Sequence, residues 1–171
     1  MSKGTKVPIS LFVPCKNEES NLAKCLESVP WVGEVFVVDS QSTDRTGSIA
    51  KEHGANVVQF EYKGGWPKKK NWALENLPFS NEWVLILDAD ECLPPEAEEE
   101  IRNIVTNPDE KHAGYWLNRR YFFMGQPLRH AYFPNWNLRL FRHKLGRYEK
   151  ITDLSTESGD HEIHEHVVVQ G

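Results

Sequence analysis

Four short apolar runs, each followed by a segment with helical character, constrain the fold of this chain more than any other feature. The runs cover residues 9–13, 35–38, 57–60 and 83–87. Apolar runs of this length are typical of strands buried on both faces of a sheet. Strands that alternate with helices pair in parallel through right-handed crossovers. We therefore predict an α/β protein with a mostly parallel central sheet flanked by helices.

The segments between the runs carry helix-boundary residues. Apolar residues recur at helical spacing over residues 22–29, and Gly54 is placed to end a second helix. Pro67 suits the first turn of a third helix, and Pro94 and Pro95 open a fourth. We expect strands without long helices over residues 114–123, 136–141 and 162–169, which form an antiparallel C-terminal addition.

Composition limits the classes of function. The net charge of −5 argues against general nucleic-acid binding, which requires a basic face. No run of apolar residues is long enough for a transmembrane helix, and residues 1–8 lack the apolar core of a signal peptide. The three scattered cysteines favour a reduced, cytoplasmic protein. The length of 171 residues is that of one domain.

Charge is unevenly distributed along the chain. Residues 88–100 carry seven carboxylates and no basic residue, whereas residues 119–147 carry seven arginines and lysines and no carboxylate. The basic stretch, with its aromatic residues between 115 and 148, is compatible with peripheral contact at the inner face of a membrane or with an anionic ligand. A solvated basic face explains it equally well.

Polar residues stand where the predicted strands end. Asn17 and Glu18 follow the first run, Asp39 ends the second, and Asp88 and Asp90 follow the fourth. In open parallel sheets the ligand binds at this edge. Each aspartate alone also suits a helix cap or turn, but three strand ends that converge on acidic and polar groups favour a binding site.

The Asp88-Ala89-Asp90 sequence predicts a metal site. Alternate carboxylates at the end of a strand approach one hard cation, and Mg²⁺ or Mn²⁺ commonly shares oxygen ligands with substrate phosphates. Such an ion neutralises charge on a leaving diphosphate. The chain has no phosphate-binding P-loop, no dinucleotide-binding glycine fingerprint and no nucleophile elbow.

Three ordered segments resemble the family 2 glycosyltransferases. They read ISLFVPCKNEE over residues 9–19, VVDSQSTDRT over 37–46 and LILDADE over 85–91. The later segment PNWNLRLFR, residues 134–142, is similar to bacterial lipopolysaccharide core β-1,4-glucosyltransferases. The length predicts a single domain over residues 1–171, and the resemblance implies the A-type glycosyltransferase fold and inversion at the anomeric carbon. It also implies a metal-dependent nucleoside-diphosphate sugar donor, with UDP favoured.

The same resemblance implies roles for particular residues. Residues 1–110 form the donor-binding half, and residues 111–171 the acceptor and catalytic half. Asp39 matches the residue that contacts the base or ribose, and Asp90 is the more usual direct metal ligand. The remaining donor-site residues are Pro14, Asn17, Glu18, Lys70, Asn71 and Asp88. Cys15 and Gln41 depart from the family pattern without a change of charge.

An inverting transfer also needs a carboxylate that accepts the proton of the acceptor hydroxyl. The late His164-Glu165 pair resembles that of the family, which favours Glu165 as the base, with Glu162 as the alternative. The neighbouring histidines suggest zinc as a minor alternative, although a strand does not reproduce the helical spacing of protease zinc sites.

The acceptor is expected to be a glycan or a lipid-linked glycan, and its candidate contacts are Trp136, Arg139 and Arg142. Stacking on sugars is one role for Trp66, Trp72, Trp116 and Trp136, but core packing is the expectation for each, with Trp136 the best acceptor-site candidate among them. Two other functions remain open: an inactive or truncated domain that binds the nucleotide sugar, and a sugar-1-phosphate nucleotidyltransferase. The second lacks the glycine-rich basic loop that it would need after the first strand.

Overall fold

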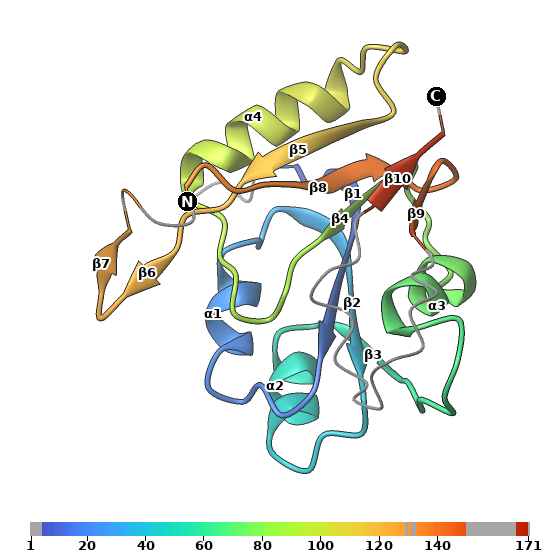
Figure 1. Ribbon diagram of the computed structural model, residues 1–171, viewed down its shortest axis with the longest axis vertical. Coiled ribbons are helices and arrows are strands. Elements are labelled where there is room, and N and C mark those ends of the chain that lie inside the picture. Colours follow the sequence, from blue (N-terminus) through green and yellow to red (C-terminus); the bar gives the residue numbers. More distant parts are fainter. Residues whose placement is uncertain (1–4, 129, 131–132, 150–166, 171) are drawn as a thin grey trace.

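A six-stranded sheet of order β3-β2-β1-β4-β8-β5 forms the centre of the protein (Figure 1). The computed structural model describes residues 5–128, 130, 133–149 and 167–170. The parallel strands are β1 (Val7–Cys15), β2 (Val32–Asp39), β3 (Asn56–Gln59) and β4 (Trp83–Ile86). Strand β8 (Trp136–Arg142) runs antiparallel to β4, and β5 (Gly114–Asn118) runs antiparallel to β8. The predicted α/β class with an antiparallel addition is confirmed.

Both faces of the sheet are covered, which explains why β1 and β4 are almost continuously apolar. One core cluster packs the sheet against α1 (Leu22–Glu27), α2 (Thr46–Glu52) and α4 (Pro95–Thr106). A second cluster packs the other face against α3 (Lys69–Asn76), β9 (Gly146–Tyr148) and β10 (Val167–Val169). Strands β9 and β10 pair with each other in antiparallel fashion.

Two of the helix boundaries predicted from the sequence are confirmed, and one lies at a different residue. Gly54 follows α2 with φ of 75°, as expected of a glycine at the end of a helix, and Pro95 opens α4. Helix α3 begins at Lys69 rather than at Pro67, because the backbone of Lys68 is extended.

The predicted strand over residues 114–123 was wrong in its length. Strand β5 ends at Asn118, and a separate hairpin follows, formed by β6 (Phe122–Phe123) and β7 (Gln126–Pro127). Met124 and Gly125 both have positive φ, 49° and 77°, which suits the tight turn of a two-residue hairpin. Of the predicted strand over residues 162–169, the described part is β10, and the rest lies outside the described residues.

Candidate functional site

The loops that follow β1 and β2 are bound to each other at the carboxyl edge of the sheet. The side-chain oxygen of Asn17 accepts a hydrogen bond from the Thr43 amide at 2.8 Å, and the Asn17 amide donates to Ser42 Oγ at 2.8 Å. The Glu18 amide donates to Thr46 Oγ1 at 2.8 Å. Asn17 has φ of 55°, a left-handed conformation that asparagine tolerates better than most residues. These bonds hold Asn17 and Glu18 at the predicted edge.

Asp39 is buried at the end of β2, and neutral donors hold its carboxylate in place. Its Oδ1 accepts from the Ser42 amide at 3.1 Å, and its Oδ2 accepts from Gln59 Nε2 at 2.9 Å. Pro14 is likewise buried, in β1, where it is the register partner of Val38 in β2. Asp39 therefore shapes the loop after β2, and its contact with a nucleotide stays a prediction.

Asp88 lies in a cluster of charged side chains drawn from four separate segments. Lys70 Nζ is 3.1 Å from Asp88 Oδ1, and the Arg139 guanidinium is 2.6 Å from Oδ2. Arg139 also contacts Glu91 at 2.9 Å, and Arg119 contacts the same Glu91 oxygen at 3.1 Å. The other oxygen of Glu91 accepts a hydrogen bond from the Asp88 amide at 2.9 Å. The sequence analysis did not assign Glu91 or Arg119 to the site, because no periodic pattern links these two positions to Asp88.

The cations decide the ionisation of Asp88. Burial alone would raise the pKa of this carboxyl, but Lys70 and Arg139 outweigh that effect and hold the pKa well below its usual range. Burial likewise tends to lower the pKa of the Arg139 guanidinium, and the carboxylates of Asp88 and Glu91 raise it instead. Asp88 is therefore charged at neutral pH, and each of its two oxygens contacts a cation.

Asp90 lies two residues further on, in a different environment. It is exposed, and within the part of the chain that the structure describes its carboxylate takes part in no hydrogen bond or ion pair. Among those same residues, no group of three or more histidine, cysteine, aspartate or glutamate side chains is placed to hold a metal ion. Mg²⁺ and Mn²⁺ commonly use one or two protein carboxylates and complete their shell with water and substrate phosphate. Of the two aspartates, Asp90 therefore fits such an ion better than Asp88.

Helix α3 brings its first residues to the same edge. Lys69 Nζ donates to the carbonyl oxygen of Cys15 at 3.2 Å, and Lys70 contacts Asp88. Asn71 is buried and points elsewhere, because its amide donates to the Tyr148 carbonyl at 2.8 Å and accepts from the Tyr148 amide at 2.9 Å. The structure thus places Lys70 at the site and uses Asn71 to hold β9.

The remaining predicted residues are distributed over several places. Arg142 lies at the far end of β8, where it pairs with Glu82 and stacks 4.9 Å from the Trp83 ring centroid, so the structure does not bring it to the site. Arg139 belongs to the cluster around Asp88, where its side chain is buried. The candidate bases Glu162 and Glu165 and their neighbouring histidines lie outside the described residues.

Three tryptophans are more exposed than the sequence suggested. Trp66 is 37% exposed, Trp116 54% and Trp136 56%, which overturns the expectation of core packing for these three residues. Trp116 pairs with Leu138 across β5 and β8, and Trp136 is two residues from Leu138, so both indoles stand on one face of the sheet. Strand β8 runs antiparallel to β4, which places Trp136 toward the edge that carries Asp88.

These features define an α/β fold with polar and charged side chains at the carboxyl edge of its parallel strands and an acidic pair after its fourth strand. The chain belongs to glycosyl transferase family 2, whose family profile matches residues 10–159.

Relatives with curated names come from several bacteria. The lipopolysaccharide core biosynthesis glycosyltransferase LpsC of Rhizobium meliloti is 34% identical over 97% of this chain and 59% of its own length. An uncharacterized glycosyltransferase of Rickettsia typhi is 33% identical over 86% of this chain and 51% of its own length. The chain therefore spans between half and two thirds of the length of these relatives.

Solved structures confirm the A-type glycosyltransferase fold. S. aureus TarS 1–349 in complex with UDP superposes with a TM-score of 0.58 at 23% identity, over 80% of this chain and 47% of that chain. The mannosyltransferase PcManGT from Pyrobaculum calidifontis, in complex with GDP-Man and Mn²⁺, gives 0.51 at 25% identity, over 68% of this chain and 37% of that chain. Across the described residues, no helix has the length and apolarity needed to cross a bilayer.

Proposed function

We propose that this chain binds a nucleoside-diphosphate sugar together with Mn²⁺ or Mg²⁺ and transfers the sugar, with inversion, to a glycan or lipid-linked acceptor in cell-envelope polysaccharide synthesis. The observation that carries the proposal is the placement of Asp88 and Asp90 at the end of β4, beside the loops after β1 and β2. Family membership and the name of the Rhizobium meliloti relative support sugar transfer in envelope synthesis.

The charged cluster suits the diphosphate of such a donor. Lys70, Arg119 and Arg139 supply three cations to the two carboxylates of Asp88 and Glu91, so the cluster keeps a surplus positive charge. Arginine and lysine side chains fixed in this way stabilise charge on a leaving diphosphate without reorganisation. A divalent ion at Asp90, when bound, adds charge neutralisation at the same point. The PcManGT structure with GDP-Man and Mn²⁺ supports a metal of this type.

The acceptor side of the proposal rests on the exposed indoles and on the late carboxylates. Trp136, together with Trp116, offers flat apolar rings near the edge that carries Asp88, and rings of this kind suit the apolar face of a sugar. In the transfer, the acceptor oxygen bonds to the anomeric carbon as the bond to the diphosphate breaks. Glu165, or Glu162 in its place, takes the proton of the acceptor hydroxyl.

The proposal is tested by thermal unfolding against a panel of nucleoside diphosphates and nucleotide sugars, with and without Mn²⁺. A ligand at a hundredfold excess over its dissociation constant stabilises the folded state by about 2.7 kcal/mol, which shifts the melting temperature measurably. We expect a shift that requires both the metal and one base, with uridine favoured by the resemblance. A shift with GDP but not with UDP would assign the donor to guanosine instead of uridine. No shift with any nucleotide would contradict donor binding.

The identity of the catalytic base, the carboxylate that takes the proton of the acceptor hydroxyl, is tested by glutamine substitutions in a donor-hydrolysis or transfer assay. We expect Glu165→Gln to keep the nucleotide-induced shift and to lower kcat by roughly a hundredfold or more, because proton transfer contributes that much to such reactions. Glu162→Gln is the matched control, with the same change three residues earlier. Full activity of Glu165→Gln together with loss of activity in Glu162→Gln would exchange the two assignments. If the unchanged chain and both variants bind the donor but none of them shows turnover, the result would favour the alternative of an inactive, donor-binding domain.

A further inference from the structure

The hairpin formed by β6 and β7 presents three consecutive apolar side chains to solvent. Phe122 is 64% exposed, Phe123 66% and Met124 87%. Figure 1 shows the hairpin projecting away from the sheet and its helices. Single exposed apolar residues are common on protein surfaces, but a contiguous run of three at a projecting tip marks an interaction site.

The alternation of a strand shows that the tip packs on neither side. Adjacent strand residues point to opposite faces, so a hairpin that rested on the core would bury one of the two phenylalanines. Phe122 and Phe123 are instead exposed to nearly the same degree. Both faces of the tip are therefore available to a partner that surrounds it rather than to one that covers a single side.

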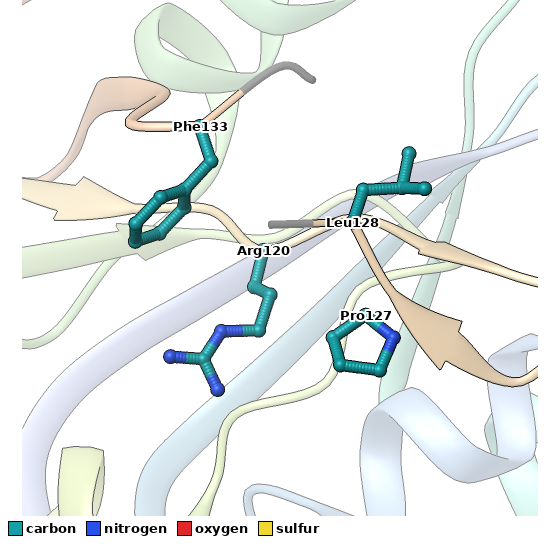
Figure 2. A pocket seen from close by; sticks show the side chains of 4 residues that line it. All are labelled: Arg120, Pro127, Leu128 and Phe133. Carbon is teal, nitrogen blue, oxygen red and sulfur yellow. The ribbon is translucent and has the colours of Figure 1, made fainter. Parts of the chain in front are cut away.

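The base of the hairpin is cationic and aromatic. Arg120 directs its guanidinium into a hollow of about 300 Å³ that Pro127, Leu128 and Phe133 also line (Figure 2). The Arg120 guanidinium lies 5.9 Å from the Phe133 ring centroid, and that of Arg119 lies 5.5 Å from the ring of Tyr121. Of the arginines in this part of the chain, Arg119 and Arg139 are paired with Asp88 and Glu91, and Arg142 is paired with Glu82. Among the described residues Arg120 takes part in no ion pair, so its charge is available to an anionic partner.

We propose that this hairpin inserts its tip into the interfacial layer of an anionic lipid bilayer. Phe122, Phe123 and Met124 lie below the headgroups, and Arg120 lies at the level of the lipid phosphates. The arginine favours this layer because its apolar stem leaves water while its guanidinium stays solvated, and the two phenylalanines and the methionine gain by removing apolar surface from water. Strands of only two residues leave backbone groups without ladder partners, so the tip stays in the interface, where water and phosphates satisfy them.

Charge favours a bilayer over a second copy of the chain. Two hairpins packed tip to tip would bring the Arg120 guanidinium groups of the two copies toward each other, whereas an anionic leaflet attracts both. The inference goes beyond the proposed function, because it concerns where the domain works and requires neither donor nor acceptor.

The test is co-sedimentation of the full chain with vesicles of phosphatidylcholine, with and without phosphatidylglycerol. We expect binding to the anionic vesicles that weakens as salt rises. The combined variant Phe122→Ser, Phe123→Ser and Met124→Ser should lose at least about tenfold in partition coefficient, because three exposed apolar side chains no longer leave water. Its melting temperature should match that of the unchanged chain, since the tip adds nothing to the core.

Two further variants sharpen the test. Arg120→Gln should weaken binding to anionic vesicles and leave any binding to neutral vesicles unchanged. Tyr62→Ser is the control, because Tyr62 is an exposed aromatic residue after β3, at the opposite edge of the sheet from β5. The proposal is overturned if the unchanged chain does not bind anionic vesicles. It is equally overturned if the triple variant binds these vesicles as strongly as the unchanged chain. It is also overturned if the unchanged chain is a dimer that the triple variant converts to a monomer.

Discussion

Replacement of Asp90 by asparagine is expected to remove the metal-dependent part of nucleotide binding and to leave the fold intact. The side chain is exposed, and in the described residues it makes no contact that the fold depends on, so the stability of the free protein should change by less than about 0.5 kcal/mol. A hundredfold loss of affinity would reduce a stabilisation of about 2.7 kcal/mol to about 0.4 kcal/mol at the same nucleotide concentration. Thermal unfolding with nucleotide, with and without Mn²⁺, measures this difference.

Asp109→Asn is the matched control for the substitution at Asp90. Asp109 is also an exposed aspartate, and it lies beyond α4, where it contacts His112 rather than the cluster around Asp88. We expect this variant to keep the full Mn²⁺-dependent shift. If Asp90→Asn also keeps the full Mn²⁺-dependent shift in melting temperature, the metal is bound by other residues. Asp88 could then bind the ion only by giving up its contact with Lys70 or Arg139.

Replacement of Arg139 by methionine is expected to lower the free energy of unfolding by about 1.5–3 kcal/mol, because Asp88 and Glu91, both partly buried, each lose a charged hydrogen bond and keep only Lys70 and Arg119 as partners. The Arg139 side chain is only 6% exposed and contacts both Asp88 and Glu91. Methionine keeps most of the apolar stem, so the measured loss reports the guanidinium rather than a cavity. Urea unfolding of the free protein gives the difference directly.

Arg119→Met gives the comparison for Arg139→Met within the same cluster. Arg119 contacts the same two carboxylates, but its side chain is 29% exposed, and solvent screens its contribution. We expect its loss to cost less than about 1 kcal/mol. Equal losses for the two arginines would show that burial does not separate their contributions, and the cluster would then behave as a surface network.

Local pattern was sufficient to predict the parallel strands and the polar residues at their ends. The runs that became β1 and β4 are apolar because both faces of the sheet are covered, and the carboxyl edge follows from the strand direction. This reasoning placed Asn17, Asp39 and Asp88 at one edge. It requires only the order of elements along the chain and the alternation of strands with helices.

The partners of those residues could not be predicted in the same way. The contact between Asp88 and Arg139 joins positions 51 residues apart, and that between Asn71 and Tyr148 joins positions 77 apart. Neither leaves a periodic signal. Trp116 was expected in the core because tryptophan is usually well buried, but β5 is an edge strand and the described residues leave this indole exposed. Contacts and exposure of this kind depend on which distant segments meet.

The paired hydrogen bonds between Asn71 and Tyr148 have a consequence for the independence of the two halves of the chain. One side-chain amide supplies both the donor and the acceptor that a neighbouring strand would offer to β9, so helix α3 acts as an additional strand edge. Strand β8 joins the halves a second time, through its ladder with β4. A fragment that ended at residue 110 would leave the Asn71 amide without its partner and β4 as an open edge. Residues 1–110 are therefore not expected to form a separable module, since the strand held by Asn71 lies beyond them.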